Sequence, residues 1–196
     1  MKYPDYIQDL IQYFSKWPSV GPKTAERYVF YLLQQAPHKI TELADSLRRL
    51  PQETLYCQEC RSLSKNQVCE ICQDKNRDHQ ILCVVENIQD LHLIEKTGQF
   101  KGYYFVLGKL LNTIESIGPE QLPIKELHLA IKKRKANELL VALDFSLEGE
   151  STAMYLKKTF PDLKISRLAR GLPSGSDLEY ADELTLSNAL KYKNDI

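Results

Sequence analysis

Hydrophobic residues in the first 55 positions recur at the spacing of α-helices. The first run shows the i, i+3, i+4, i+7 pattern of a helix with one buried face, and it consists of Ile7, Leu10, Ile11 and Phe14. The run ends in segment 17–22, where Pro22 suits the first turn of a new helix because its missing N–H is not needed there. The second run repeats the pattern with Ala25, Tyr28, Val29, Leu32 and Leu33.

A third helical pattern begins at about Lys39, and we expect Pro51 to stop it because proline lacks the N–H that continues a helix. The positions expected to face inward are Ile40, Leu43, Ala44, Leu47 and Leu50. The pattern therefore predicts a small helical domain in the first 55 residues.

Beyond residue 80, short apolar runs alternate with helical patterns. Continuous runs rich in β-branched and aromatic residues predict buried strands at 81–85, 103–107, 139–143 and 165–169. Helical patterns are predicted at 87–96, around 124–131 and at 150–160. This alternation indicates an α/β unit with a mostly parallel sheet. Residues 170–196 contain turn residues and a short helical pattern that ends in LSNALKYK.

Charge and composition place the chain among ordinary globular proteins, with 43% hydrophobic and 27% charged residues. No stretch reaches the roughly 20 apolar residues of a membrane helix, and the polar start MKYPDYIQDL is unlike a secretion signal. We therefore expect a cytoplasmic protein with reduced thiols. Its 26 basic and 26 acidic residues balance, so binding to nucleic acid would require local patches or several subunits together.

One basic run interrupts this balance, at Lys132–Lys135. Such a run is typical of a solvated helix end, but it is also the charge pattern of a DNA-contacting patch. The residues alone leave both interpretations open.

The segment YCQECRSLSKNQVCEICQ, at positions 56–73, holds two Cys-x-x-Cys pairs. Cys57, Cys60, Cys69 and Cys72 supply the four thiolates of a tetrahedral zinc site, and the eight-residue spacer 61–68 is long enough for a small hairpin. Disulfides would suit a secreted chain, and a redox pair usually opens a helix after a strand. Zinc fits the spacing and the expected compartment better than either.

A zinc ion with four cysteine ligands has no open position for substrate, so we expect a structural site. Metal binding would then supply most of the folding free energy of this short polar segment. The fifth cysteine, Cys83, lies within ILCVV and is predicted to be a core residue.

The sequence WPSVGPKTAER lies between the first two helical patterns. Gly21 is expected to let the backbone turn tightly and to leave N–H groups uncovered at the start of the next helix, where they attract anions. Lys23, Thr24 and Arg27 would reach the same phosphate without reading bases. An ordinary packing corner between two helices explains the residues equally well at this point.

These parts, in this order, resemble the bacterial RecR family of recombination mediators. PSVGPKTAERYVFYLL resembles a helix-hairpin-helix motif, and CQEC…CEIC followed by ILCVVE continues the likeness. So do GYYFVLGKLLNTIESIGPEQL, LEGESTAMYL and ARGLPSGSDLEYADELTL. Three positions depart from the family pattern: Ser19 replaces the first hairpin glycine, Tyr104-Phe105 replaces Tyr-His, and Gly175-Ser176 replaces a double glycine.

The resemblance implies an α+β fold of several parts. Residues 1–55 would form the helix-hairpin-helix domain, 56–73 a four-cysteine zinc finger, 80–175 a Toprim domain with a mostly parallel sheet, and 176–196 a C-terminal assembly segment.

Toprim enzymes hold Mg²⁺ with carboxylates at the ends of neighbouring strands, and the resemblance places Glu86, Asp144, Glu148 and Glu150 there. The usual Asp-x-Asp is interrupted by Ser146, which argues against catalysis. We therefore expect no enzyme, and an acidic face that docks the partner protein RecO rather than Mg²⁺. A solvated acidic rim is the plainer alternative.

By resemblance, the chain would be a non-enzymatic DNA-binding mediator of DNA repair. It would act with RecO, and in many bacteria RecF, to help load RecA onto gapped or single-stranded DNA coated with SSB. The family also implies a ring-shaped homotetramer. The alternatives are a Mg²⁺-dependent Toprim nuclease and a zinc-stabilised interaction module without DNA contact.

Overall fold

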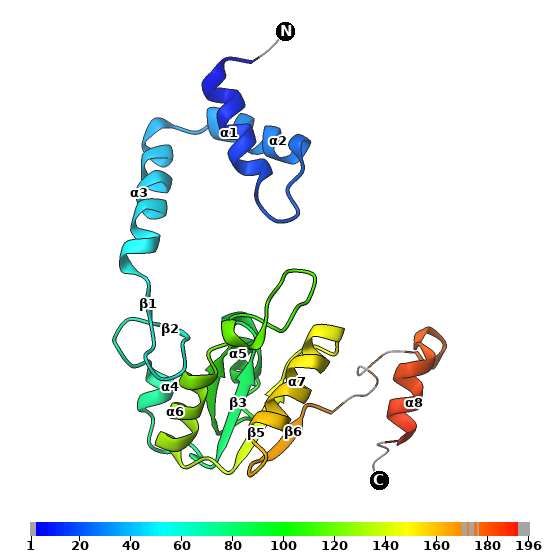
Figure 1. Ribbon diagram of the computed structural model, residues 1–196. Helices are drawn as coiled ribbons and strands as arrows, with labels where there is room; N and C mark the ends of the chain where they lie inside the picture. Colours follow the sequence, from blue (N-terminus) through cyan, green and yellow to red (C-terminus); the bar gives the residue numbers. More distant parts are fainter. Residues whose placement is uncertain (1–2, 170–171, 173–174, 176, 192–196) are drawn as a thin grey trace. The chain divides into compact units, whose positions relative to one another are not determined.

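The computed structural model describes residues 3–169, 172, 175 and 177–191 (Figure 1). The chain divides into two compact units, Met1–Thr54 and Leu55–Ile196. The first unit is helical, whereas the second contains every strand of the described part of the chain.

In the first unit, α1 (Asp5–Ser15) and α2 (Pro22–Leu33) form a hairpin with Ile7, Ala25 and Val29 buried. Both helices agree with the predicted patterns. Aromatic rings close the hairpin: Phe14 lies edge-on to Trp17 at 4.9 Å and to Tyr28 at 6.0 Å between ring centroids. Tyr3 adds an edge-on contact with Phe30 and donates a hydrogen bond of 2.6 Å to Glu26.

The third helix differs from the prediction. α3 (Pro37–Glu53) begins before Lys39 and contains Pro51 in its last turn, so Pro51 does not stop it. Only two residues follow Pro51, and so few helical hydrogen bonds remain to be lost. None of the α3 residues is buried, so the first unit by itself does not cover the face that was expected to point inward.

The second unit is built on a four-stranded parallel sheet, as the alternating pattern predicted. Its order is β4 (Tyr103–Val106), β3 (Ile81–Val85), β5 (Glu138–Ala142) and β6 (Lys164–Arg167). The central strand β3 pairs in register with both neighbours, with Val84 opposite Phe105 on one side and Val141 on the other.

Helices cover both faces of this sheet. α6 (Ile124–Arg134) and α7 (Leu147–Thr159) cover one face and contribute Leu127 and Leu156 to its core. α5 (Ile88–Lys96) covers the other face, where Leu91 packs with Cys83. Cys83 is fully buried, as predicted, and burial raises the pKa of its thiol to about 12.

The cysteine segment belongs to the second unit. A two-stranded hairpin, β1 (Leu55–Tyr56) and β2 (Leu63–Ser64), carries the first cysteine pair at its tip. The two strands therefore flank Cys57–Cys60: β1 precedes the first pair and β2 lies in the spacer 61–68, whereas the spacer alone was expected to hold a small hairpin. The second pair opens a short helix, α4 (Glu70–Gln73), whose N-cap is Cys69, whereas the sequence indicated a loop.

This segment covers the edge of the sheet at β4. The Val106 N–H donates to the Cys60 carbonyl at 2.9 Å, and the Asp78 N–H donates to the Lys101 carbonyl at 2.9 Å. An uncovered edge strand offers unpaired backbone groups to other chains, so this cover protects the sheet from edge-to-edge association.

The remaining elements are two short 3-10 helices, Pro119–Gln121 and Leu178–Tyr180, and α8 (Glu183–Lys191). The predicted C-terminal helical pattern thus corresponds to α8. Ser176 and residues 192–196 of the expected assembly segment lie outside the described residues. None of the helices in the described part of the chain combines the length and apolar character that a membrane crossing requires.

Candidate metal centre and nucleic-acid interface

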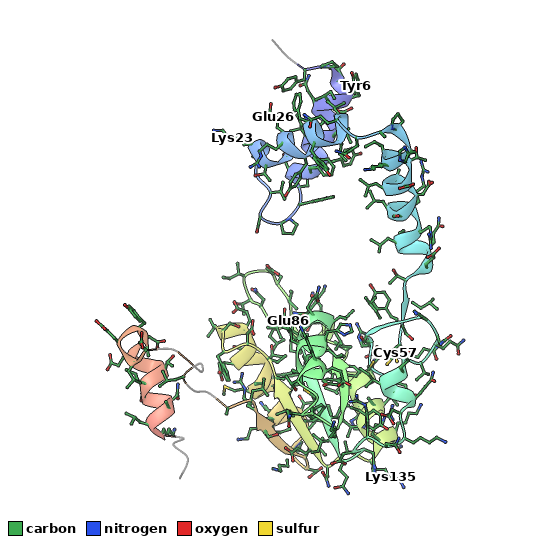
Figure 2. The ribbon with its side chains drawn as sticks, turned by 180° about the vertical axis from the view of Figure 1, so that it is seen from behind. Tyr6, Lys23, Glu26, Cys57, Glu86 and Lys135 are labelled. Carbon is green, nitrogen blue, oxygen red and sulfur yellow. The ribbon has the colours of Figure 1, made fainter. Side chains whose placement is uncertain are left out.

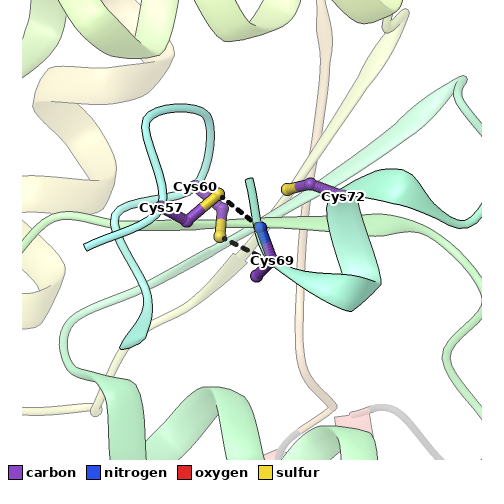
Figure 3. Close-up of side chains that lie close together, drawn as sticks. All are labelled: Cys57, Cys60, Cys69 and Cys72. Carbon is purple, nitrogen blue, oxygen red and sulfur yellow. Dashed lines mark hydrogen bonds between the residues drawn. The ribbon is translucent and has the colours of Figure 1, made fainter. Parts of the chain in front are cut away.

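The four predicted cysteines come together in a buried cluster (Figure 3). Their sulfur atoms all lie within 4.8 Å of one another, and the Cys60 and Cys69 sulfurs are 3.5 Å apart. Tetrahedral Zn–S bonds of about 2.3 Å would place the sulfurs about 3.8 Å apart, so the cluster fits the ion closely. The Cys69 N–H donates to the Cys57 sulfur at 3.3 Å, a contact that favours a thiolate.

The protonation of these thiols also supports a cation site. Hydrogen bonds from Cys60 and Cys72 lower the pKa of Cys69. Hydrogen bonds with Cys60 and Cys69 raise the pKa of Cys72, and burial raises it further. Four thiolates cannot share this buried space unless a cation balances their charge, which is the condition that a bound metal satisfies. The structure thus brings together a group able to hold a metal ion such as zinc.

The basic run at the end of α6 lies against this cluster. Lys133 pairs with Glu59 at 2.7 Å, and Arg134 pairs with the same carboxylate. Glu59 lies between Cys57 and Cys60 in the chain. Two of the four cations are therefore engaged within the protein, and the run is not simply a solvated helix end.

In the helical hairpin, the structure reverses the expected roles of two turn residues. Ser19 adopts the left-handed conformation, with φ +60°, whereas Gly21 has φ −82° in ordinary extended backbone. The prediction that Gly21 makes the tight turn was therefore wrong. A glycine at position 19 would relieve the strain that a side chain carries there.

Gly21 instead serves as the N-cap of α2, next to Pro22. Within the described residues no side chain caps this helix end, and a Cβ at position 21 would meet nothing within 4 Å. The backbone N–H groups of Lys23 and Thr24 precede the first helical bond, which Ala25 donates to Gly21. The open helix end is thus accessible to an anion.

Lys23, which is labelled in Figure 2, is exposed on α2. Arg27 is also exposed and stands four residues further along, so the two residues share one helix face. Thr24 lies beside them and is partly buried. Neither cation has an ion-pair partner among the described residues. Two unengaged positive charges beside an open helix N-terminus match a contact to a phosphate backbone.

The predicted carboxylates lie at the carboxyl end of the sheet but do not form one compact group. Glu86 follows β3, and burial, with the nearby charges of Asp90 and Asp144, raises its pKa. Burial and Asp144 likewise raise the pKa of Asp90, a residue that the sequence reasoning missed. Its spacing of four residues from Glu86, around the first turn of α5, was an available signal.

The other two carboxylates have different surroundings. Glu148 lines a cleft of about 620 Å³ together with Glu86 and Lys109. Glu150 pairs with Arg167 at 2.7 Å, on the side of α7 that faces β6. Among the described residues, the four cysteines are the only group of three or more ligands close enough to hold one metal ion. The carboxylates therefore present an acidic rim rather than a ready metal site.

Ser146, which interrupts the Asp-x-Asp pattern, has a structural task. Its hydroxyl accepts the Gly149 N–H at 3.1 Å and so caps α7. A Cβ on Gly149 would lie 2.0 Å from the Asp144 carbonyl oxygen, so only glycine permits this tight start of the helix.

Comparisons with known proteins agree with this arrangement. Residues 7–50 match the family model of the RecR helix-hairpin-helix, 80–169 that of the Toprim domain, and 171–193 that of the RecR C-terminal part. The Recombination protein RecR of Moorella thermoacetica is 41% identical and is covered, like this chain, over its full length. Those of Nocardioides sp. and Staphylococcus aureus strain JH9 are 44% and 42% identical, over 95% and 97% of both chains.

Likeness at this level extends over the helical hairpin, the sheet and the C-terminal part alike, and so the chain belongs to the RecR family of recombination proteins.

Proposed function

We propose that this protein is a non-enzymatic mediator of recombinational DNA repair. It binds DNA without sequence preference and, with RecO and where present RecF, promotes the loading of RecA onto gapped or single-stranded DNA coated with SSB. A Toprim domain alone is not evidence for catalysis, and the dispersed carboxylates do not favour a nuclease.

One observation carries the proposal: the open N-terminus of α2, with Lys23 and Arg27 on one face, within a segment that matches the RecR hairpin. The exposed cations and the uncovered N–H groups both favour phosphate oxygens. A contact of this kind positions the protein on the backbone but reads no bases.

We further propose that four copies form a ring and present several such hairpins to one DNA molecule. The chain has no net charge, so a single copy has no long-range attraction for DNA. Linked weak contacts raise the effective concentration of each hairpin at the DNA. The uncovered apolar face of α3 is available for such assembly.

The other two sites take supporting roles in this proposal. One zinc ion at Cys57, Cys60, Cys69 and Cys72 stabilises the segment that covers the β4 edge. Glu86, Asp144, Glu148 and Glu150 form an acidic face that attracts a basic surface of RecO through complementary charge. Mg²⁺ has no part in the proposed function.

The DNA contact is tested by replacing Lys23 and Arg27 separately with alanine and measuring affinity for single-stranded DNA across a salt series. Each substitution should weaken binding to all sequences alike and lower the salt slope by about 1, because one phosphate contact is lost. Lys158→Ala, which removes an exposed cation from α7, is the matched control and should leave the slope unchanged. A loss confined to certain sequences would contradict backbone binding.

The RecO contact is tested by charge reversal at Glu86 and Asp144. The double variant should lose RecO binding and retain the DNA affinity of the unmodified protein. Retained RecO binding would refute the docking role of the acidic face, and reproducible cleavage of DNA that depends on Glu86 would refute the mediator function.

A further inference from the structure

Arg134, the last residue of α6, reaches both cysteine pairs from the sheet domain. Its side chain is only 15% exposed. One terminal nitrogen of the guanidinium donates to the Glu59 carboxylate and also, at 3.1 Å, to the carbonyl oxygen of Cys72. A single side chain therefore links the first pair, through Glu59, with a ligand residue of the second.

The guanidinium of Arg134 is itself held in place by an aromatic ring of the sheet. It lies over the ring of Tyr103 on β4, 3.6 Å from the ring centroid, a distance at which cation and ring attract. The hydroxyl of Tyr103 donates to the Asp74 carbonyl at 2.6 Å, just beyond the second cysteine pair. The stacked Arg134 and Tyr103 thus contact the main chain at the end of α4 and just after it.

Arginine is chemically suited to this position. Its planar group carries several donors at fixed angles and stacks on aromatic rings, whereas a lysine ammonium offers a compact charge on a flexible stem. The neighbouring Lys133 shows the difference, since it reaches only Glu59 and is 62% exposed. Because the Lys133 ammonium is largely exposed to water, its pair with Glu59 contributes little.

We propose that Arg134 is a positioning residue for the metal centre. It holds the two cysteine pairs at the separation where their four sulfurs converge, and so slows release of the metal ion. Partners that orient metal ligands typically change metal affinity by about 10- to 100-fold when removed. The inference rests on the metal centre of the proposed function, but it is independent of DNA binding and of RecO.

The positioning role is tested with Arg134→Gln. Lys133→Gln, on the same helix turn, is the control. Zinc-loaded protein is mixed with excess chelating indicator dye at about 25 °C, well below unfolding, and the rate of zinc transfer is followed. Arg134→Gln should release zinc about 10- to 100-fold faster than the unmodified protein. Lys133→Gln, which removes a contact to the same carboxylate, should stay within about twofold.

Arg134→Lys is the second variant. Because it keeps the positive charge, it is less prone to simple misfolding than Arg134→Gln. It should still release zinc faster, since lysine cannot hold Glu59 and the Cys72 carbonyl together while stacking on Tyr103. The absorption of the Co²⁺-loaded variants reports the tetrahedral thiolate geometry independently of stability. Broadened or shifted bands in both Arg134 variants are expected.

Two results would overturn the proposal: zinc release from both Arg134 variants at the unmodified rate, or equal acceleration by Lys133→Gln. A lower melting temperature with unchanged release and unchanged Co²⁺ spectra would likewise show a merely structural contact. If the unmodified protein bound no stoichiometric zinc, this result would refute the metal centre itself. The DNA and RecO measurements use other residues and other readouts, so the positioning role of Arg134 and the mediator function are tested separately.

Discussion

The two compact units of this chain differ in how they use their apolar residues. In the second unit, apolar residues fill both faces of the parallel sheet, and Leu127, Leu139 and Leu156 are fully buried. In the first unit, the buried residues of the three helices are Ile7, Ala25 and Val29. Many large apolar side chains remain exposed there, among them Tyr6, Tyr13, Tyr31, Leu33, Leu43, Leu47 and Leu50.

This difference distinguishes a domain that completes its own core from one that leaves much of its apolar surface exposed. Scattered exposed apolar residues are normal, but a helix such as α3, with an apolar face and no buried residue, is unusual for a monomer. The first unit therefore fits the assembly of several copies proposed above. The second has the character of an independent domain, and the cysteine segment covers the edge of its sheet at β4.

Loss of the metal centre should have the largest effect on the stability of the second unit. Cys72→Ser removes one thiolate and should cost more than about 4 kcal/mol of stability, because ligand loss releases the ion and uncovers the β4 edge. Metal content, thermal unfolding and light scattering measure the outcome. Cys83→Ala, which removes a buried cysteine outside the cluster, should retain the metal. Full metal content in Cys72→Ser would contradict the assignment.

The core of the second unit should give the next largest effect. Leu139→Ala creates a cavity in a fully buried position and should cost about 2–5 kcal/mol in denaturant unfolding. The cost should be equal at every protein concentration, because this core belongs to one chain. A cost that varies with concentration would show that the second unit also depends on assembly.

Leu47→Asp tests the first unit, where the expected effect is on self-association rather than on the stability of the fold. Leu47 is 53% exposed in the single chain, so the change should scarcely affect the fold. It should nevertheless weaken self-association at least about tenfold, or about 1.4 kcal/mol, because it places a charge in the proposed interface. Sedimentation over a concentration series measures the assembled mass. Ser46→Asp, an equal charge on a neighbouring exposed residue, is the control. An unchanged mass in Leu47→Asp would make α3 an ordinary surface.

The acidic face should give the smallest effects. The folded protein raises the pKa of Glu86, so it binds the proton more tightly than the unfolded chain does. Stability must therefore fall as pH rises from the unfolded to the folded pKa, and the cost persists above that window. Glu86→Gln should remove this cost, with a gain at pH 7 of at most about 0.5 kcal/mol and none in strong acid.

Glu150→Gln is the informative contrast, because Glu150 pairs with Arg167. It should lose up to about 1 kcal/mol at pH 7, opposite in sign to Glu86→Gln. Thermal unfolding of both variants between about pH 3 and pH 7 measures the difference. The same sign for both would show that the acidic face is electrostatically uniform.

Much of the fold could be predicted because its signals are local. The parallel strands, the helices between them and the four cysteines follow from periodicity, turn residues and ligand spacing. The predictions were wrong where the surrounding structure outweighed a local sequence rule. Pro51 lies so near the end of α3 that the helix tolerates it, and the strain of the hairpin turn rests on Ser19 rather than Gly21.

The sequence by itself determined which residues are helical, which are extended and which four thiols are available to a metal, because these depend on neighbours along the chain. Only the tertiary structure decided that Asp144 lies near Glu86, that Glu150 is neutralised by Arg167, and that Arg134 reaches both cysteine pairs. The last two contacts join residues 17 and more than 60 positions apart. No periodicity encodes such pairs, because their geometry is set by the packing of helices against the sheet.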